Sequence, residues 1–243
     1  MRARQSPAVG PTVFPLLKHC RQFQDHQSIA SEGDWMLWQL ADSAFPAGGF
    51  AHSGGLEAAW QHGEVRNASE LAALSESSLR QLGHASLPFV CAAHDDPSQL
   101  VALDHWCDAF ITNHVANRAS RLQGRAFLSS TEKIFPGRQV GHPPCGHFAP
   151  VFGAVARTLG LEHSRAGRMF FFLHLRGLIA AAIRLGIVGP MEGQAMQHRL
   201  SPVAREILAR CDTMAVAEAA QTAPLLEIWQ GTQDRLYSRL FQS

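Results

Sequence analysis

The chain has 243 residues, a length at which one domain can bury a substantial core. Its 21 basic and 20 acidic residues leave a net charge of +1, and 46% of its residues are apolar. This composition favours a globular protein and gives no sign of a nucleic-acid partner. The five cysteines are odd in number and include no C-x-x-C pair, which argues against a disulfide framework and favours a reducing, cytoplasmic location.

The segment before Asp25 carries basic residues and no acidic one. An acid-poor, arginine-containing leader is typical of mitochondrial transit peptides, and this is one interpretation of the segment. Its prolines favour the other interpretation, an extension without regular structure. We therefore predict a disordered N-terminal extension at residues 1–33 and a single domain at residues 34–243.

Apolar residues recur with helical spacing from Asp34 onward, and alternating β-branched runs are nearly absent. The pattern predicts an all-α fold, a single helical-bundle domain of about eight to ten helices. Asp34, Ser69 and the pair Ser201-Pro202 are predicted helix starts. We expect helices at residues 34–40, 53–63, 69–82, 87–94, 98–135, 148–159, 164–188 and 201–214.

Two segments in the second half of the chain have a clear physical interpretation. Residues 136–147 contain three prolines and three glycines, too many helix breakers for anything but a loop. The longest apolar stretch, residues 169–188, contains His174, Arg176 and Arg184, which are costly at the centre of a bilayer. We therefore interpret it as a buried helix rather than a membrane span.

Two motifs bear on whether the chain is an enzyme. Lys18 and Lys133 follow no glycine-rich loop, so the chain lacks the phosphate-binding loop of a GTPase. The segment around Ser53 differs by one residue from the G-x-S-x-G nucleophile elbow, but a proline-glycine turn precedes it where the elbow needs a strand. We interpret Ser53 as a helix-capping residue. A serine hydrolase at Ser53, or a metal-dependent hydrolase using the loop at His142, remains the alternative function.

The chain has 13 histidines, and the tightest cluster of metal-binding residue types is His142, Cys145 and His147. Imidazole and thiolate groups are good ligands for nickel or zinc. A closed structural site usually needs a fourth ligand. The cluster therefore predicts transient contact with nickel and no tightly bound cofactor.

Residues 38–57 carry the strongest family signal. They resemble the N-terminal signature of urease accessory protein F, with a Pro-x-Gly-Gly-Phe turn followed by Ser-x-Gly-Leu-Glu. The residues of this segment are most similar to those of eukaryotic members. The matching positions are Pro46, Gly48, Gly49, Phe50, Ser53, Gly55, Leu56 and Glu57. From the turn chemistry itself we expect Gly48 or Gly49 to adopt a positive φ.

Two further blocks agree with this family, and each lies beside a departure from it. Ser120 and Gly124 resemble the family's Ser-x-x-x-Gly helix, although Asn117 stands where an arginine is usual. The closing segment resembles the family's Tyr-Ser-Arg-Leu-Phe ending, although Gln233-Asp234 replaces the His-Glu pair of many bacterial members. The matching residues of this ending are Leu236, Tyr237, Ser238, Arg239, Leu240 and Phe241.

The resemblance implies a non-catalytic, all-helical protein that forms a homodimer and binds the D-type accessory protein, called H in some species. It further implies recruitment of the G-type GTPase and delivery of nickel to apo-urease. We predict that residues 236–241 bind the D-type partner, with Leu236, Tyr237, Leu240 and Phe241 on one face if the tail becomes helical. The alternative is that the tail packs back on its own core.

Overall fold

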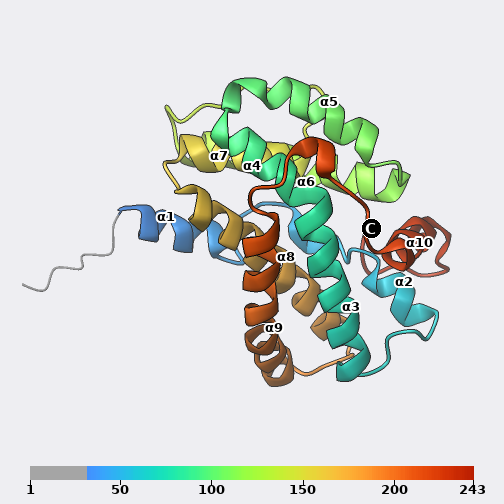
Figure 1. The fold of residues 1–243 in the computed structure, drawn as a ribbon. Coiled ribbons are helices and arrows are strands. Elements are labelled where there is room, and N and C mark those ends of the chain that lie inside the picture. The colour runs from blue at the N-terminus through green and yellow to red at the C-terminus, as the bar shows by residue number, and fades with distance from the viewer. Residues whose placement is uncertain (1–31) are drawn as a thin grey trace, which may run out of the picture.

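The computed structural model describes residues 32–243, and nearly all of the predicted N-terminal extension lies outside them. The described residues form helices and no strand, which confirms the predicted all-α class (Figure 1). The α-helices are α1 (Glu32–Ala41), α2 (Leu56–Gln61), α3 (Ala68–Gln81), α4 (Leu87–Asp95), α5 (Leu100–Phe110), α6 (His114–Ile134), α7 (Phe148–Thr158), α8 (His163–Arg184), α9 (Pro190–Cys211) and α10 (Pro224–Thr232).

The helices pack as two groups (Figure 1). In one group, α7 lies against both α4 and α6, and α5 also contacts α7. In the other, α8 packs along α9, and α3 contacts both of them. Helix α1 lies on one flank, and α2 and α10 lie together on the opposite flank (Figure 1). Residues 136–147 connect α6 to α7 as the predicted loop.

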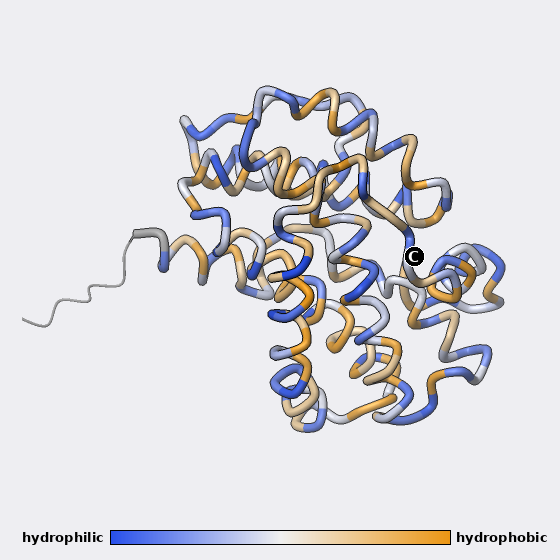
Figure 2. The backbone as a smooth tube through the Cα atoms, in the orientation of Figure 1, coloured by the Kyte–Doolittle hydropathy of each residue, from blue (hydrophilic) through white to orange (hydrophobic). Residues whose placement is uncertain are grey.

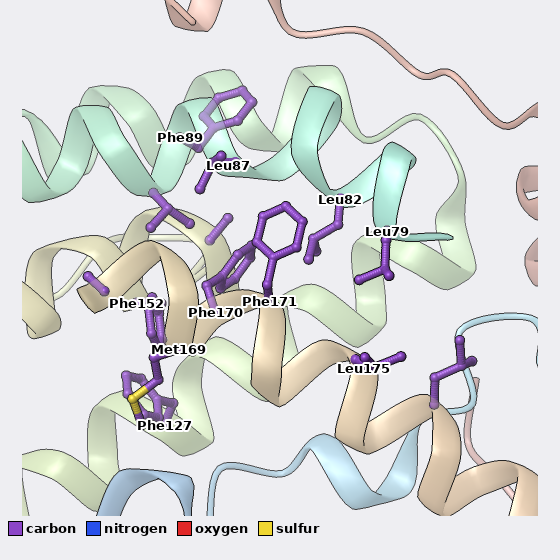
Figure 3. Packing of buried hydrophobic residues seen from close by; sticks show 14 of the residues in the cluster. Leu79, Leu82, Leu87, Phe89, Phe127, Phe152, Met169, Phe170, Phe171 and Leu175 are labelled. Atoms are coloured by element: carbon purple, nitrogen blue, oxygen red, sulfur yellow. The ribbon is translucent and has the colours of Figure 1, made fainter. Parts of the chain in front are cut away.

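Aromatic and aliphatic side chains from both groups meet in one interior (Figure 3). The rings of Phe127 and Phe152 stack with centroids 5.6 Å apart, and Phe152 lies 5.3 Å from Phe170. A fully buried phenylalanine contributes roughly 1.5–3 kcal/mol by leaving water. Figure 2 shows hydrophobic and hydrophilic stretches alternating along most helices, the pattern expected when each buries one face.

Helix α8 occupies the middle of this interior. Within residues 32–243 it is the one helix long and apolar enough to span a membrane by length and composition. Its side chains are instead packed against protein, since Phe171, Leu175 and Ile179 are buried and α9, α3 and α4 lie around it. The apolar stretch is therefore a buried core helix, as predicted.

Helices α3 and α4 form one continuous helical rod. A π-helix at Leu82–Ser86 joins them, so α4 begins at residue 87 as predicted but follows α3 without the predicted break. Pro88 has no N–H for the carbonyl one turn earlier, and the wider π turn accommodates the missing bond. Gly83 in this turn lets α9 approach, because a Cβ there would lie 2.5 Å from Ile207 Cγ2.

Two predicted helix caps are wrong. Helix α3 begins at Ala68, and the Asn67 side chain accepts the backbone N–H groups of Ser69 and Glu70 at 3.0 and 3.1 Å. Asn67, and not the predicted Ser69, is thus the cap of α3. Helix α1 begins at Glu32, so Asp34 lies inside it, where its carboxylate pairs with Arg165 of α8.

Two predicted helix limits differ from the structure. The helix expected at residues 98–135 is broken at residues 111–113, and the Asn113 side chain caps α6 by accepting Val115 N–H at 3.0 Å. Helix α9 begins at Pro190 and passes through Pro202 instead of starting there. A single buried stripe on α9 outweighs the cost of the internal proline, and it consists of Gly193, Met196, Leu200, Ile207 and Cys211.

Candidate functional site

The Pro46–Phe50 turn packs against α6. Gly48 has a φ of +73°, which confirms the predicted positive φ at one of the two glycines, and Gly49 does not share it. A Cβ on Gly48 would lie 3.2 Å from Ala126 Cβ of α6. The Ser130 hydroxyl of the same helix donates to the Pro46 carbonyl at 2.9 Å. The turn thus has both its conformation and its position fixed.

Phe50 leaves this turn and points outward, with 70% of its surface exposed. The Arg184 guanidinium of α8 lies over the Phe50 ring, 4.0 Å from its centroid, and over the Phe241 ring at 4.2 Å. Arg184 also donates to the Phe50 carbonyl at 2.8 Å. One cation therefore joins the N-terminal turn to the C-terminal tail.

Helix α2 begins at Leu56, later than the predicted residue 53, and Gly55 rather than the predicted Ser53 occupies its N-cap position. The Ser53 hydroxyl accepts the Glu57 backbone N–H at 3.4 Å, and Ser53 is only 2% exposed. A buried serine at a helix start, with no strand before it, lacks the exposed hydroxyl of a nucleophile elbow. Gly55 has a φ of +89°, and a Cβ there would lie 3.1 Å from Gln230 N of α10. Leu56 is fully buried beneath it.

The Glu57 carboxylate is the main anchor of the C-terminal tail. It is 1% exposed and accepts three hydrogen bonds, from Leu240 N at 2.6 Å, Phe241 N at 3.1 Å and Gln233 Nε2 at 2.6 Å. A buried charge needs such a full set of donors to be tolerated. The Glu at the end of the family-like signature therefore holds the family-like ending of the chain.

The tail packs back on the fold, as in the alternative prediction. Residues 236–243 form no helix, so the apolar face expected if the tail became helical is not formed in this structure. Backbone bonds fix the segment, including Gln242 N–H to the Ala51 carbonyl at 2.8 Å and Gln61 Nε2 to the Ser238 carbonyl at 2.8 Å. Phe241 is buried, whereas Leu236 is half-buried.

Several side chains of the tail and of the segment beneath it remain exposed. Tyr237 is 104% exposed, Leu240 52% and Trp60 39%. Exposed aromatic and apolar groups of this kind, beside an arginine, are typical of protein interfaces. We call this region the tail surface and define it by Phe50, Trp60, Tyr237, Arg239 and Leu240.

The two residues that depart from the family's His-Glu pair both serve the tail. Gln233 is fully buried and donates to Glu57. Asp234 accepts a bidentate bond from Arg118 of α6 at 2.8 and 3.0 Å and a third bond from Arg239 at 3.1 Å. The bond from Arg118 is the main cause of the lowered pKa of Asp234. In this chain, Asp234 thus tethers α6 to the tail, and Gln233 bonds the Glu57 carboxylate that anchors it.

The Ser120 and Gly124 positions seat the loop before α7. Ser120 Oγ accepts Phe148 N–H at 3.2 Å and lies 3.1 Å from His147 Nδ1. Gly124 has no room for a side chain, because a Cβ there would lie 2.2 Å from the Gly146 carbonyl oxygen. The family-like Ser-x-x-x-Gly spacing therefore has a packing cause, with one helical turn separating the hydrogen bond from the close approach.

The loop brings together only part of the predicted metal cluster. His142 lies apart, with its Nε2 atom 3.2 Å from Glu132 Oε1 and its side chain 76% exposed. Cys145 and His147 instead group with Asp108 of α5, and their donor atoms all lie within 4.8 Å of one another. His147 Nε2 is 3.0 Å from Asp108 Oδ1. In the cluster that the structure shows, Asp108 thus stands in place of the predicted His142.

Asp104, one turn before Asp108, holds the backbone of this loop. Its fully buried carboxylate accepts the N–H groups of Cys145, Gly146 and His147 at 2.7, 3.2 and 2.8 Å. Neither aspartate is among the residues predicted from the sequence. The available signal was two acidic residues four apart on an apolar helix, a spacing that places them on one face.

Burial and hydrogen bonding set the protonation of the group. Burial lowers the pKa of His147 below its ordinary value, more than the neighbouring Asp108 raises it, so the ring is neutral near pH 7. Burial, with the charges of Asp104 and Asp108, raises the pKa of Cys145. The bond from Asn117, followed by that from His147, lowers the pKa of Asp108. Asn117 Nδ2 donates to Asp108 Oδ1 at 3.0 Å.

Comparisons with known proteins identify the family to which this sequence is similar. The family model described as UreF matches residues 65–201. The chain is 37% identical to the urease accessory protein F of Oryza sativa subsp. japonica over 219 residues, which cover 85% of this chain and 84% of that protein. It is 38% identical to the protein of the same name in Arabidopsis thaliana over 221 residues, covering 86% and 92%. A Schizosaccharomyces pombe protein called uncharacterized urease accessory protein UreF-like is 29% identical over 222 residues, covering 84% and 94%. The chain therefore belongs to the urease accessory protein F family.

Proposed function

We propose that this chain is a non-catalytic assembly factor in urease maturation. Its relatives are named accessory proteins rather than enzymes, and the one serine motif in its sequence is a buried helix start. In this proposal the chain binds the D-type accessory protein and, together with it, the G-type GTPase. The assembly would then deliver nickel to apo-urease.

The observation that carries the proposal is the tail surface. Two family-like blocks, residues 46–57 and residues 236–243, lie far apart in the sequence, and the Glu57 carboxylate joins them directly. Their buried residues fix the backbone, while Tyr237, Arg239 and Leu240 face solvent. A rigid surface with exposed aromatic and apolar groups binds a partner at a lower entropy cost than a mobile tail would.

Point variants of exposed residues test this surface without disturbing the fold. Tyr237→Ala and Leu240→Ser should each weaken capture of a tagged D-type accessory protein at least tenfold, since interface anchors commonly contribute on the order of 1–4 kcal/mol. Affinity is measured by calorimetry, and thermal melting checks that the variants remain folded.

Met191→Ser on α9 is the matched control, because Met191 is 85% exposed and lies outside the tail surface. It should leave affinity unchanged. Wild-type affinity in both tail variants would remove the tail surface from the proposal. Recruitment of the G-type GTPase is measured for the same variants by co-purification with the preformed pair of this chain and the D-type protein.

The proposal also includes a homodimer and a cytoplasmic location, which rest on the family resemblance and on the cysteine composition respectively. Light scattering of the purified chain measures its mass in solution. A mass equal to the 26.5 kDa of one chain across the micromolar range would contradict the dimer.

A further inference from the structure

The end of α5 and the loop before α7 converge on one small polar site. We propose that Asp108, Cys145 and His147 together bind a single divalent transition-metal ion. The choice of nickel as the ion rests on the proposed function. The site itself rests on the three donor atoms, which come from two segments and all lie within 4.8 Å of one another.

The separation between the imidazole and the carboxylate already fits a shared ion. Nitrogen and oxygen ligands bind such ions at about 2.0–2.2 Å, which places two ligand atoms on one ion roughly 3 Å apart. His147 Nε2 lies 3.0 Å from Asp108 Oδ1. Cys145 lies on the loop beside them, and its Sγ atom is within 4.8 Å of both ligand atoms, so binding requires only a short further approach of the thiolate.

Outer partners hold the ligands in place. Ser120 Oγ lies 3.1 Å from His147 Nδ1 and can accept a hydrogen bond from Nδ1–H, which leaves the Nε2 lone pair for the ion. Asp104 accepts the backbone N–H groups of both Cys145 and His147. Partners that orient a histidine ligand through its second nitrogen are a regular feature of metal sites.

The donor set indicates which ion is bound and how firmly. One nitrogen, one sulfur and one oxygen ligand favour nickel or zinc over magnesium or calcium. Three protein ligands leave at least one position open, unlike the closed four-ligand sites of structural zinc. The Asp108 side chain is 41% exposed, so the ion can enter and leave from solvent. These are properties of a transfer site rather than of a permanent one.

The competing explanation is that His147 and Asp108 form only a structural hydrogen bond. Cys145→Ser separates the two explanations, because the Cys145 thiol makes no hydrogen bond in the described part of the chain. The substitution removes a metal ligand and leaves the His147 contacts intact. Asp108→Asn is the second variant, since its Oδ1 atom can still accept from Asn117 while the charge is lost.

The experiment titrates nickel chloride, and separately cobalt chloride, into the purified full-length chain. Calorimetry gives the affinity and stoichiometry, and absorption spectroscopy follows the thiolate-to-metal charge-transfer band. We expect one ion per chain in the wild type, loss of the band in Cys145→Ser and at least tenfold weaker binding in both variants. Two control variants, His142→Ala and Cys20→Ser, should keep the band and the affinity.

Three results would overturn the assignment: no binding by the wild type, an unchanged band in Cys145→Ser, or loss of the band in His142→Ala with retention in Asp108→Asn. The last result would return the ion to the loop alone. Metal binding is measured on the isolated chain, whereas the proposed function is tested by capture of a partner through the tail surface. The two proposals can therefore fail separately. A Cys145→Ser chain that loses metal but still captures the D-type partner would support both.

Discussion

Gly48 shows how one residue fixes the family-like turn. Its φ of +73° is unfavourable for any residue with a side chain, and its Cβ position faces Ala126 at 3.2 Å. The neighbouring Gly49 has no positive φ, and a Cβ there would meet the end of the flexible Gln123 side chain at 3.0 Å. The two neighbouring glycines therefore allow the effect of a positive φ to be tested by the same substitution at both positions.

We expect Gly48→Ala to lower the free energy of unfolding by about 1 kcal/mol or more, because alanine is strained at positive φ. Gly49→Ala should cost less, since only a side-chain end must move. Urea denaturation of both variants measures the difference. Equal losses for the two alanines would show that the turn does not depend on the φ of Gly48.

Glu57 gives a second prediction at the residue scale. A glutamine in its place keeps one acceptor oxygen but turns an NH₂ group toward N–H donors that now bond the carboxylate. We expect Glu57→Gln to destabilise the fold by about 1–3 kcal/mol, the usual cost of leaving buried polar groups unpaired. Glu64→Gln, at an exposed position, is the control and should be near neutral. Denaturant unfolding that does not distinguish the two variants would argue against the anchor.

At the scale of elements, the contact between α8 and α3 carries a partly buried titratable group. His174 of α8 lies 2.7 Å from the Ser78 hydroxyl of α3, and burial lowers the pKa of His174 from 6.5 to about 4. Between these two values the unfolded chain holds the proton more tightly than the folded chain. Stability is therefore complete above pH 6.5 and decreases as the pH falls toward 4.

The loss reaches at most about 3 kcal/mol, from roughly 1.4 kcal/mol for each pKa unit. His174→Gln keeps a hydrogen-bonding group at this position but cannot titrate in this range. The difference in unfolding free energy between wild type and variant should therefore change with pH by up to that amount from pH 7 to pH 4. Parallel pH profiles of the two proteins would mean that burial does not lower the pKa of His174.

The helical periodicity of apolar residues predicted the helices better than it predicted where one helix ends and the next begins. The helical spacing of apolar residues identified the core helices, and the proline-rich loop at residues 136–147 was placed correctly. The π-helix joining α3 to α4 was missed, because it depends on the packing of Gly83 against α9 rather than on local preference. The internal Pro202 misled the prediction for the same reason, since burial of one face of α9 outweighs a local stop signal.

The candidate site was predicted in part. Turn chemistry identified Gly48, and residue types identified Cys145 and His147. Asp108 was not predicted to lie beside Cys145 and His147, and His142 lies apart from them, because sequence proximity on a loop does not determine which side chains meet. Partners from α5 and α6 are visible only in the fold.

For the whole molecule, the distance along the chain between Glu57 and Leu240 has a consequence for folding order. Their hydrogen bond joins residues 183 positions apart, so it closes a loop that contains nearly the whole domain. Closing so long a loop is entropically costly until the helices between its ends have packed. The tail surface therefore completes last, and its displaced form would leave the Glu57 carboxylate without its donors. In the proposed function, a partner that binds this surface would recognise only chains that have finished folding, and partner binding would itself exclude immature copies from assembly.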